Sequence, residues 1–348
     1  MMNAIIENVL IEKVTNQFHR SPRQMNQLHE SDAEILKLPE NANQVLAITT
    51  DSIVEEIALG VYDDPYLIGW MAVMVNMSDL AAVGARPLGI LVSEVLPGSY
   101  PDTSLAALQR GIQDACAACQ TYVLGGDTNF GTHLMLTGTA LGTIDGSRTL
   151  SRVGCKPGDA LYATGVLGGG NAFALSQITR PGNCILRFQP SARLNEGRTL
   201  TGIASTCMDT SDGVISTLDQ LMRLSRVGFE IDEDWEKHLD PRSKELAGAF
   251  GIPSWLLLAG QHGEFELLFT IPQNSESMLH DAAEKIGWHP LRLGKAVEEQ
   301  SIFLPLYGRT VNLDTQRIRN LAFQTDGDVG VYINSLLKID DEIQKGAY

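Results

Sequence analysis

The chain has 348 residues, 44% of them hydrophobic and 20% charged, which is typical of a globular protein long enough for two domains. Its 26 basic and 42 acidic residues give a net charge of −16, which argues against a nucleic-acid partner because phosphate backbones would be repelled. No segment reaches the roughly 20 apolar residues needed to cross a bilayer, and the N-terminus lacks the basic start of a signal peptide. We therefore expect a cytoplasmic protein with no membrane partner.

The first half of the chain alternates between strand and helix patterns after a weakly patterned start over residues 1–42. Strands are predicted over 45–51, 89–97, 122–128 and 133–144, and helices over 66–84 and 103–119. The helix at 66–84 is apolar nearly all round, which indicates burial on every side.

A turn-rich stretch at 154–159, Gly-Cys-Lys-Pro-Gly-Asp, predicts a domain boundary. Beyond it the sequence predicts strands at 160–165, 227–232 and 265–271, a short strand entering Met-Asp-Thr-Ser-Asp-Gly, and helices from Asn171 and over 213–225. The last thirty residues carry little signal. The alternation indicates an α/β architecture in both halves, and we expect domains at 1–150 and 151–348.

The chain has five cysteines, an odd number that favours reduced thiols over disulfides. Cys116 and Cys119 form a C-x-x-C pair, but no second pair of metal-binding type follows. We therefore interpret them as helix thiols.

Asp79 is the most unusual carboxylate in the sequence. It shares a predicted helix face with Asn76, among apolar neighbours, and the nearest basic residue is Arg86, seven positions on. A carboxylate buried there needs compensation. A bound cation and a structural hydrogen bond both remain open.

Other carboxylates stand where predicted strands end or helices begin: Asp51, Asp127, Asp209 and Asp212. Each alone could be an ordinary helix or turn cap. Together they could converge on one crevice, because strand-end residues in α/β sheets tend to meet there. A cluster of oxygen ligands without cysteine or histidine suits Mg²⁺.

Two segments could bind phosphate. Ser211, Asp212 and Gly213 open a helix whose free amides favour an anion. The glycines of Val-Leu-Gly-Gly-Gly at 166–170 precede another helix, although a tight structural turn would have the same sequence. Neither segment is a Walker A motif or a dinucleotide fingerprint.

Five segments, in order, resemble the motifs of thiamine-monophosphate kinases in the aminoimidazole-ribonucleotide (AIR) synthetase-related superfamily. They are TTDSIVEE, VNMSDLAAVGARP, VLGGDT, SRVGCKPGDALYATGVLGGG and MDTSDGV. The Asn-Met-Ser-Asp helix and the Ser-Asp-Gly turn are also similar to those of selenophosphate synthetases and a hydrogenase maturation factor.

The resemblance implies two α/β domains of the AIR-synthetase type, with the N-terminal domains of two subunits paired into a barrel in a homodimer. It also implies ATP and Mg²⁺ as cofactors and a small-molecule substrate. The implied metal ligands are Asp32, Asp51, Asp79, Asp127, Asp209 and Asp212. The implied nucleotide contacts are Gly126, Asp127, Arg152 and Ser211, with Asp212 and Asp127 as the catalytic residues.

The departures from the family motifs fall on the acceptor side. Ala58 stands where the family has a histidine, Glu264 replaces an aspartate in the segment that would contact the substrate, and Glu30-Ser31-Asp32 replaces Gly-Asp-Asp. We therefore expect an ATP-dependent kinase or ligase with an altered acceptor site. A true thiamine-monophosphate kinase and a nucleotide-binding accessory protein without turnover are the alternatives.

Overall fold

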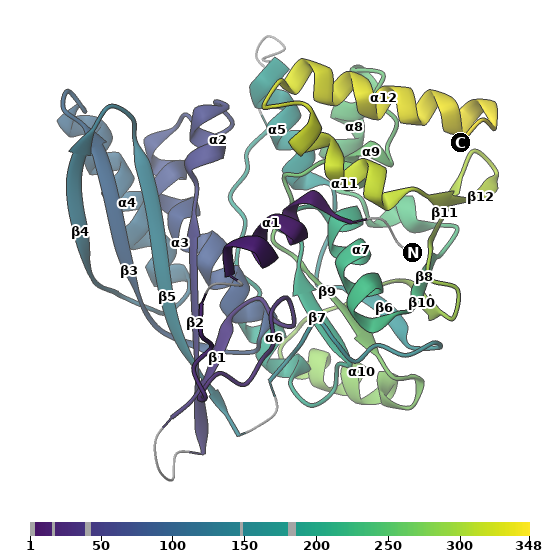
Figure 1. Cartoon of the computed structure of the whole chain (residues 1–348), viewed down its shortest axis with the longest axis horizontal. Helices are drawn as coiled ribbons and strands as arrows, with labels where there is room; N and C mark the ends of the chain where they lie inside the picture. The colour runs from purple at the N-terminus through teal and green to yellow at the C-terminus, as the bar shows by residue number, and fades with distance from the viewer. Residues whose placement is uncertain (1–3, 16–17, 39–42, 147–148, 180–185) are drawn as a thin grey trace.

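The structure is a computed structural model that describes residues 4–15, 18–38, 43–146, 149–179 and 186–348. It contains two sheets, one in each half of the chain (Figure 1). No helix among the described residues is long and apolar enough to cross a membrane.

The first sheet has the order β1-β2-β5-β3-β4 and is antiparallel except for the pair β3–β4. Its strands are β1 (Glu34–Lys37), β2 (Gln44–Ser52), β3 (Arg86–Pro97), β4 (Val123–Gly131) and β5 (Met135–Asp145). The helices of this half are α1 (Ile6–Thr15), α2 (Val54–Ala58), α3 (Pro65–Ala82) and α4 (Asp102–Ala118).

The second sheet has the order β12-β11-β8-β10-β6-β9-β7, with β8–β11 as its parallel pair. Its strands are β6 (Ala160–Ala163), β7 (Thr206–Asp209), β8 (Gly228–Ile231), β9 (Leu267–Ile271), β10 (Leu291–Val297), β11 (Ile302–Leu306) and β12 (Arg309–Leu313). The helices are α5 (Gly169–Thr179), α6 (Leu194–Leu200), α7 (Val214–Ser225), α8 (Pro241–Ala249), α9 (Leu256–Ala259), α10 (Glu276–Lys285), α11 (Thr315–Gln324) and α12 (Val329–Lys345). Two 3-10 helices lie at Trp235–His238 and Gln273–Ser275.

Helix α3 joins the two halves. One side of it packs on β2, β3 and β5, another on α4, and a third on α6 and β7 of the second half. Gly69 of α3 and Gly111 of α4 allow their helices to touch, since a Cβ at either would lie 2.0 Å from a backbone oxygen of the other helix. This contact on three sides confirms the burial that the apolar sequence predicted.

Two hydrophobic cores follow from this arrangement. The first extends from the five-stranded sheet through α3 to one face of the second sheet, where Phe269 of β9 joins it. The second lies on the opposite face, where Leu268 packs with α7. Alternate residues of β9 therefore serve different cores, as the two-residue period of a strand requires.

The chain ends contain more structure than their sequence predicted. Residues 1–42 contain α1 and β1, and the last thirty residues contain most of α11 and all of α12. Helix α1 lies within the proposed domain 1–150, yet it contacts α11 of the second half (Figure 1). The cysteine interpretation holds for the C-x-x-C pair, because Cys116 and Cys119 are buried free thiols on or next to α4; Cys184 lies outside the described residues.

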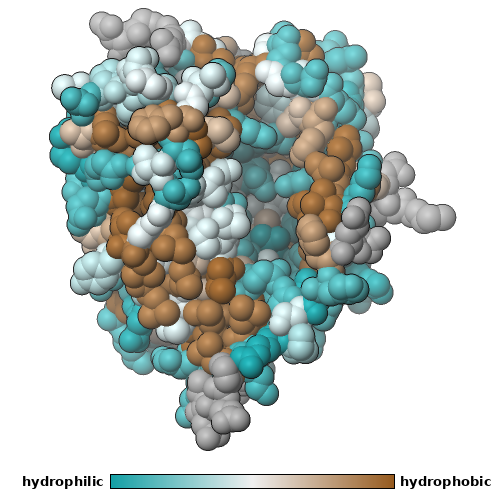
Figure 2. Space-filling view, turned by 60° about the vertical axis from the view of Figure 1, so that its left-hand side comes forward, coloured by the Kyte–Doolittle hydropathy of each residue, from teal (hydrophilic) through white to brown (hydrophobic). Residues whose placement is uncertain are grey.

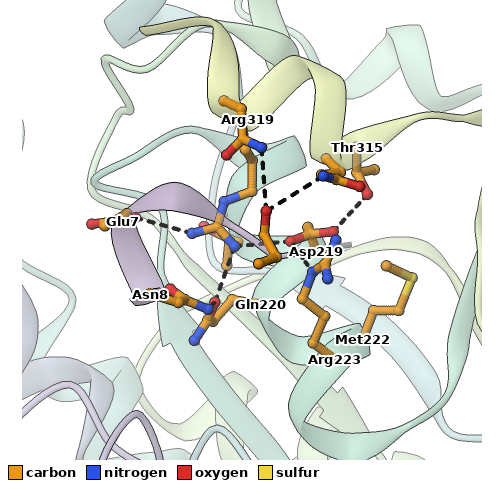
Figure 3. Close-up of polar contacts among 12 residues, drawn as sticks. Glu7, Asn8, Asp219, Gln220, Met222, Arg223, Thr315 and Arg319 are labelled. Atoms are coloured by element: carbon orange, nitrogen blue, oxygen red, sulfur yellow. Dashed lines mark hydrogen bonds and ion pairs between the residues drawn. The ribbon is translucent and has the colours of Figure 1, made fainter. Parts of the chain in front are cut away.

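A buried polar network attaches α1 to the second half (Figure 3). Arg319 of α11 donates to Asp219 of α7 at 2.8 Å and to Glu7 of α1 at 3.1 Å, and Asp219 also accepts from Arg223 and Thr315. Asp219 is fully buried and Arg319 is 6% exposed. This network links three helices that are distant in the sequence.

We expect Asp219→Asn to lower the free energy of unfolding by roughly 3–5 kcal/mol, because the buried guanidinium of Arg319 loses most of its compensating charge. Urea denaturation measures this change. The control is Asp341→Asn, which removes an exposed ion pair with Lys345 and should cost less than about 1 kcal/mol. Equal effects of the two variants would show that the network contributes little.

Candidate active site

Three carboxylates from both halves of the chain meet at the junction beside α3. Asp32 precedes β1, Asp79 lies on α3 and Asp209 ends β7, and one oxygen from each lies within 4.8 Å of the others. We call these three residues the carboxylate cluster. The sequence predicted all three as metal ligands, and the fold brings them together.

Hydroxyl groups hold the cluster in place. Thr49 of β2 donates to Asp79, and Ser78 of α3 donates to Asp209 at 2.6 Å. Ser211 also donates to Asp209, at 2.9 Å. Because Ser78 and Asp209 belong to different halves, this bond orients the two halves as well as the carboxylate.

The cluster carries more negative charge than its surroundings balance. Among the described residues, the one guanidinium in contact with it is Arg152, which donates to Asp32 at 2.8 Å. Burial and then the neighbouring Asp51 raise the pKa of Asp79 well above its usual range. Burial and then Asp32 raise the pKa of Asp209 to about 7. These carboxylates therefore need protons or a cation at neutral pH.

Asp51 and Asp212 lie at the solvent side of the cluster. Both residues keep some solvent exposure, and desolvation by the surrounding protein atoms is the largest cause that raises the pKa of each carboxyl to about 6. The charge of Asp212 is the next largest cause of the raised pKa of Asp51. Asn76, buried on α3, accepts from the Asp51 amide at 3.0 Å and so fixes this end of β2.

Asp127 does not reach the cluster within one chain. It lies on the edge strand β4, and β5 and β3 separate it from Asp51 on β2, a distance of roughly 14 Å at the usual strand spacing. Its neighbour Thr128 bonds Glu94, which accepts from Gln109 of α4, so Thr128 is on the helix-covered face and Asp127 on the other. The expectation that Asp127 converges with the other carboxylates on one crevice is therefore not met in a single chain.

The residues present fit a magnesium ion. Every ligand in the cluster is a carboxylate oxygen, which is the donor type that Mg²⁺ prefers. The Asp32 side chain is 1% exposed, and its Oδ2 has no hydrogen-bond partner among the described residues. A buried carboxylate oxygen without a partner is costly, and a bound cation would remove that cost.

The other predicted site residues are divided between the neighbourhood of the cluster and the edge of the first sheet. Ser211 and Asp212 form the turn into α7, and Gly126 precedes Asp127 on β4. Arg152 carries a raised pKa because its pairing with Asp32 outweighs burial. Its position, with one face on the cluster, suits contact with a phosphate.

Glu264 is buried behind the glycine-rich loop. Its Oε2 accepts from the Gly168 amide at 2.8 Å, its Oε1 has no partner among the described residues, and burial raises its pKa to about 8. A Cβ at Gly170 would lie 2.0 Å from the Gly263 oxygen. Close packing against Gly263 therefore requires glycine at position 170 of the loop.

Sequence reasoning missed His29, Glu7 and Arg319 near the site. After burial, which raises the pKa of Asp212 most, Glu7 raises it further and Arg319 lowers it. Each stands in a segment without a clear pattern. The one sequence signal in this region was that Glu30-Ser31-Asp32 stands where the family motif has Gly-Asp-Asp.

The pKa shifts predict the pH dependence of stability. The folded pKa of Asp209 is about 7, above its ordinary value of 3.8, so the folded state holds more protons in this window and stability falls as pH rises through it. We expect the metal-free protein to melt higher at pH 5.5 than at pH 8. Mg²⁺ should raise the melting temperature more at pH 8, by about 5 °C or more.

Differential scanning fluorimetry with and without Mg²⁺ measures this effect. The variant Asp79→Asn is the control, because removing one carboxylate relieves repulsion and should flatten the pH profile. A wild-type profile that does not change with pH or Mg²⁺ would contradict the metal-site interpretation.

Comparison with known proteins identifies the family of the chain. Residues 30–144 match the family described as AIR synthase related protein, N-terminal domain. The thiamine-monophosphate kinase of Buchnera aphidicola subsp. Schizaphis graminum is 33% identical over 265 residues, which cover 73% of this chain and 79% of that protein. The thiamine-monophosphate kinase of Pyrococcus abyssi is 32% identical, with 74% and 81% covered.

Solved structures show the same fold. The thiamine monophosphate kinase from Aquifex aeolicus has a TM-score of 0.68 at 23% identity, covering 87% of this chain and 96% of that one. The hydrogenase maturation protein HypE from E. coli has a TM-score of 0.67 at 20% identity, covering 89% and 98%. The two thiamine-monophosphate kinases named first are 33% and 32% identical to this chain over about three quarters of its length. The protein therefore belongs to the thiamine-monophosphate kinase family, a branch of the ATP-dependent AIR synthetase-related enzymes.

Proposed function

We propose that this protein transfers the γ-phosphoryl group of ATP to a small molecule in a magnesium-dependent reaction. The observation that carries the proposal is the carboxylate cluster, in which three carboxylates from both halves meet and, among the described residues, one guanidinium lies beside them. The carboxylates of this cluster repel one another, and bound cations that carry phosphates would offset that repulsion. Phosphoryl transfer needs this combination, because its main requirements are charge neutralisation and in-line positioning.

We assign some of the site residues to the metal ion and others to the nucleotide. Asp32, Asp79 and Asp209 would hold Mg²⁺ at the junction of the two halves, and Asp51 and Asp212 would hold it at the solvent side. Bound Mg²⁺ supplies neutralisation of the phosphate charge. A structural relative, AaThiL, was solved in complex with AMPPCP and TMP, which supports an ATP site in this fold.

Arg152 and Ser211 are our proposed nucleotide contacts within the chain, with Asp212 in a catalytic role. Arg152 offers a planar donor fork for phosphate, and Ser211 stands at the start of α7, where amides favour an anion. Asp212 has a raised pKa, so it can accept a proton from the acceptor near neutral pH.

We also propose a homodimer that pairs the uncovered faces of two five-stranded sheets. Apolar residues gather on this side of the molecule, which Figure 2 brings forward. Leu91, Leu124 and Met135 are between 41% and 56% exposed there. A surface of this kind on a folded chain typically marks an interface, and a twofold pairing would place the same strands against each other.

In such a dimer Asp127 and Gly126 would serve the partner's site. Asp127 points to the uncovered face, so a second copy is the one route by which it could approach a carboxylate cluster. The family motif that contains it and the apolar face beside it support this arrangement.

The prediction is complementation between two inactive variants. Asp79→Asn and Asp127→Asn should each abolish turnover. In mixed dimers one of the two sites would carry both changes and the other neither, so a refolded equal mixture should recover about a quarter of wild-type turnover. Light scattering checks that each variant is dimeric. Two dimeric variants that fail to complement would place Asp127 outside the partner's site.

We propose that the acceptor differs from thiamine monophosphate, from the side chains around His262. His262 stands where the family motif has glycine; its Nδ1 donates to the Gly170 oxygen and its Nε2 accepts from Tyr62 at 2.7 Å. The ring also packs on Phe188. With Ala58 in place of a histidine, these side chains support an acceptor other than thiamine monophosphate.

We expect kcat/KM for thiamine monophosphate at saturating ATP to lie well below about 10⁴ M⁻¹s⁻¹, the lower end of the ordinary enzymatic range. A panel of small alcohols and phosphate monoesters, assayed in parallel, would then identify the acceptor. Turnover within the ordinary range would show a true thiamine-monophosphate kinase. Tight ATP binding without transfer or hydrolysis on any acceptor would favour an accessory protein.

The four cysteines among the described residues are all free thiols. Free buried thiols are usual in a reducing compartment. This supports our proposal that the enzyme works in the cytoplasm, where ATP is available.

A further inference from the structure

A cavity of about 350 Å³ lies between the two halves of the chain, and no residue of the carboxylate cluster lines it. The start of β3 and the end of β5 line it from the first half, and α6 lines it from the second together with Ile286, which follows α10. Small molecules typically occupy cavities of this size. We call it the interdomain cavity.

Glycine contacts beside the interdomain cavity hold its walls close together. A Cβ at Gly197 of α6 would lie 2.0 Å from the Ala81 oxygen of α3, so these two helices meet backbone to backbone. Gly84, just beyond α3, has a φ of +74°, and a Cβ there would lie 2.4 Å from the Thr201 hydroxyl. Larger residues at positions 84 and 197 would push the halves apart, so the cavity is part of a closely packed junction.

Two arginines from different halves line the interdomain cavity. Arg86 begins β3 and Arg198 lies on α6, and both are exposed. Neither guanidinium has an ion pair among the described residues, although Arg198 donates to the neutral side chain of Asn195 at 2.6 Å. Asp145 is the one carboxylate among the described lining residues, and it already accepts from Gln44 at 2.7 Å. Two positive charges that share a cavity without a counterion attract an anion.

The remaining lining residues indicate which class of anion would fit. Thr199 and Thr201 contribute hydroxyl groups from the α6 side, and the planar guanidinium groups can each donate two hydrogen bonds to a phosphate. Ile144 and Ile286 add apolar surface that a bare ion would leave unused. A phosphate monoester with a small carbon skeleton suits both kinds of surface.

We propose that the interdomain cavity is a second ligand site, which binds a small phosphate monoester through Arg86 and Arg198. Neither arginine belongs to the metal and nucleotide site, so this proposal does not depend on the proposed function. Because the two arginines come from different halves, a bound phosphate bridges the halves and stabilises their contact.

The experiment is isothermal titration calorimetry with ribose 5-phosphate, inorganic phosphate, ribose and succinate. EDTA is present, so that no metal ion draws phosphate to the carboxylate cluster. Wild type is compared with Arg86→Gln and Arg198→Gln. The matched control is Arg242→Gln, which removes an exposed arginine of α8 that does not line the cavity. All three substitutions are at exposed positions and should keep the wild-type melting temperature.

Ribose 5-phosphate should bind wild type more tightly than inorganic phosphate does, and ribose should not bind. Each cavity variant should weaken the binding of ribose 5-phosphate about tenfold, the usual effect of losing a hydrogen bond between charged groups. The control should stay within about twofold of wild type. No binding to wild type, unchanged affinity in the two cavity variants, or tighter binding of succinate would overturn the proposal.

A second titration of ribose 5-phosphate, with saturating AMPPCP and Mg²⁺, separates this site from the nucleotide site. Binding that persists would place the ligand outside the nucleotide site, as we expect. Binding that AMPPCP abolishes would assign the ligand to the nucleotide site and overturn the proposal. AMPPCP that does not bind would contradict the proposed ATP-dependent function, while the first titration would still decide about the interdomain cavity.

Discussion

The structure depends on the accommodation of three carboxylates between its two halves. Asp32, Asp79 and Asp209 lie within 4.8 Å of one another, so their mutual repulsion opposes closure unless protons or a cation intervene. The hydroxyls of Thr49 and Ser78 hold two of these groups from different directions. A cation or proton that binds the cluster therefore also stabilises the contact between the two halves.

Helix α3 is the element through which this constraint acts. It contacts the first sheet on one side and β7 of the second on another, so a displacement of the cluster is a displacement of the main core. Ser78 and Asp79 are adjacent on it and reach different partners. Packing on three sides holds the helix in place, which suits a site where ligand oxygens must keep their positions.

Two surfaces of the chain differ in their chemistry and in their proposed partners. Helix α1 has no buried residue and is held by polar bonds to Arg319 and Gln220, so it covers the site region without belonging to a core. The open face of the five-stranded sheet is apolar instead. The first surface thus acts within the chain, and the second suits a second copy of it.

The sequence by itself determined the elements whose environment is recorded in their own residues. Continuous apolarity predicted the burial of α3, and Asp79 without a nearby basic residue predicted either a bound cation or a structural hydrogen bond there. Only the tertiary structure decided that Asp127 points away from Asp51, that α1 reaches α11, and that Arg152 pairs with Asp32. The physical reason is that the hydrophobic pattern of a segment shows how many of its sides are buried. It does not show which other segment buries them, and that segment can lie hundreds of residues away in the chain.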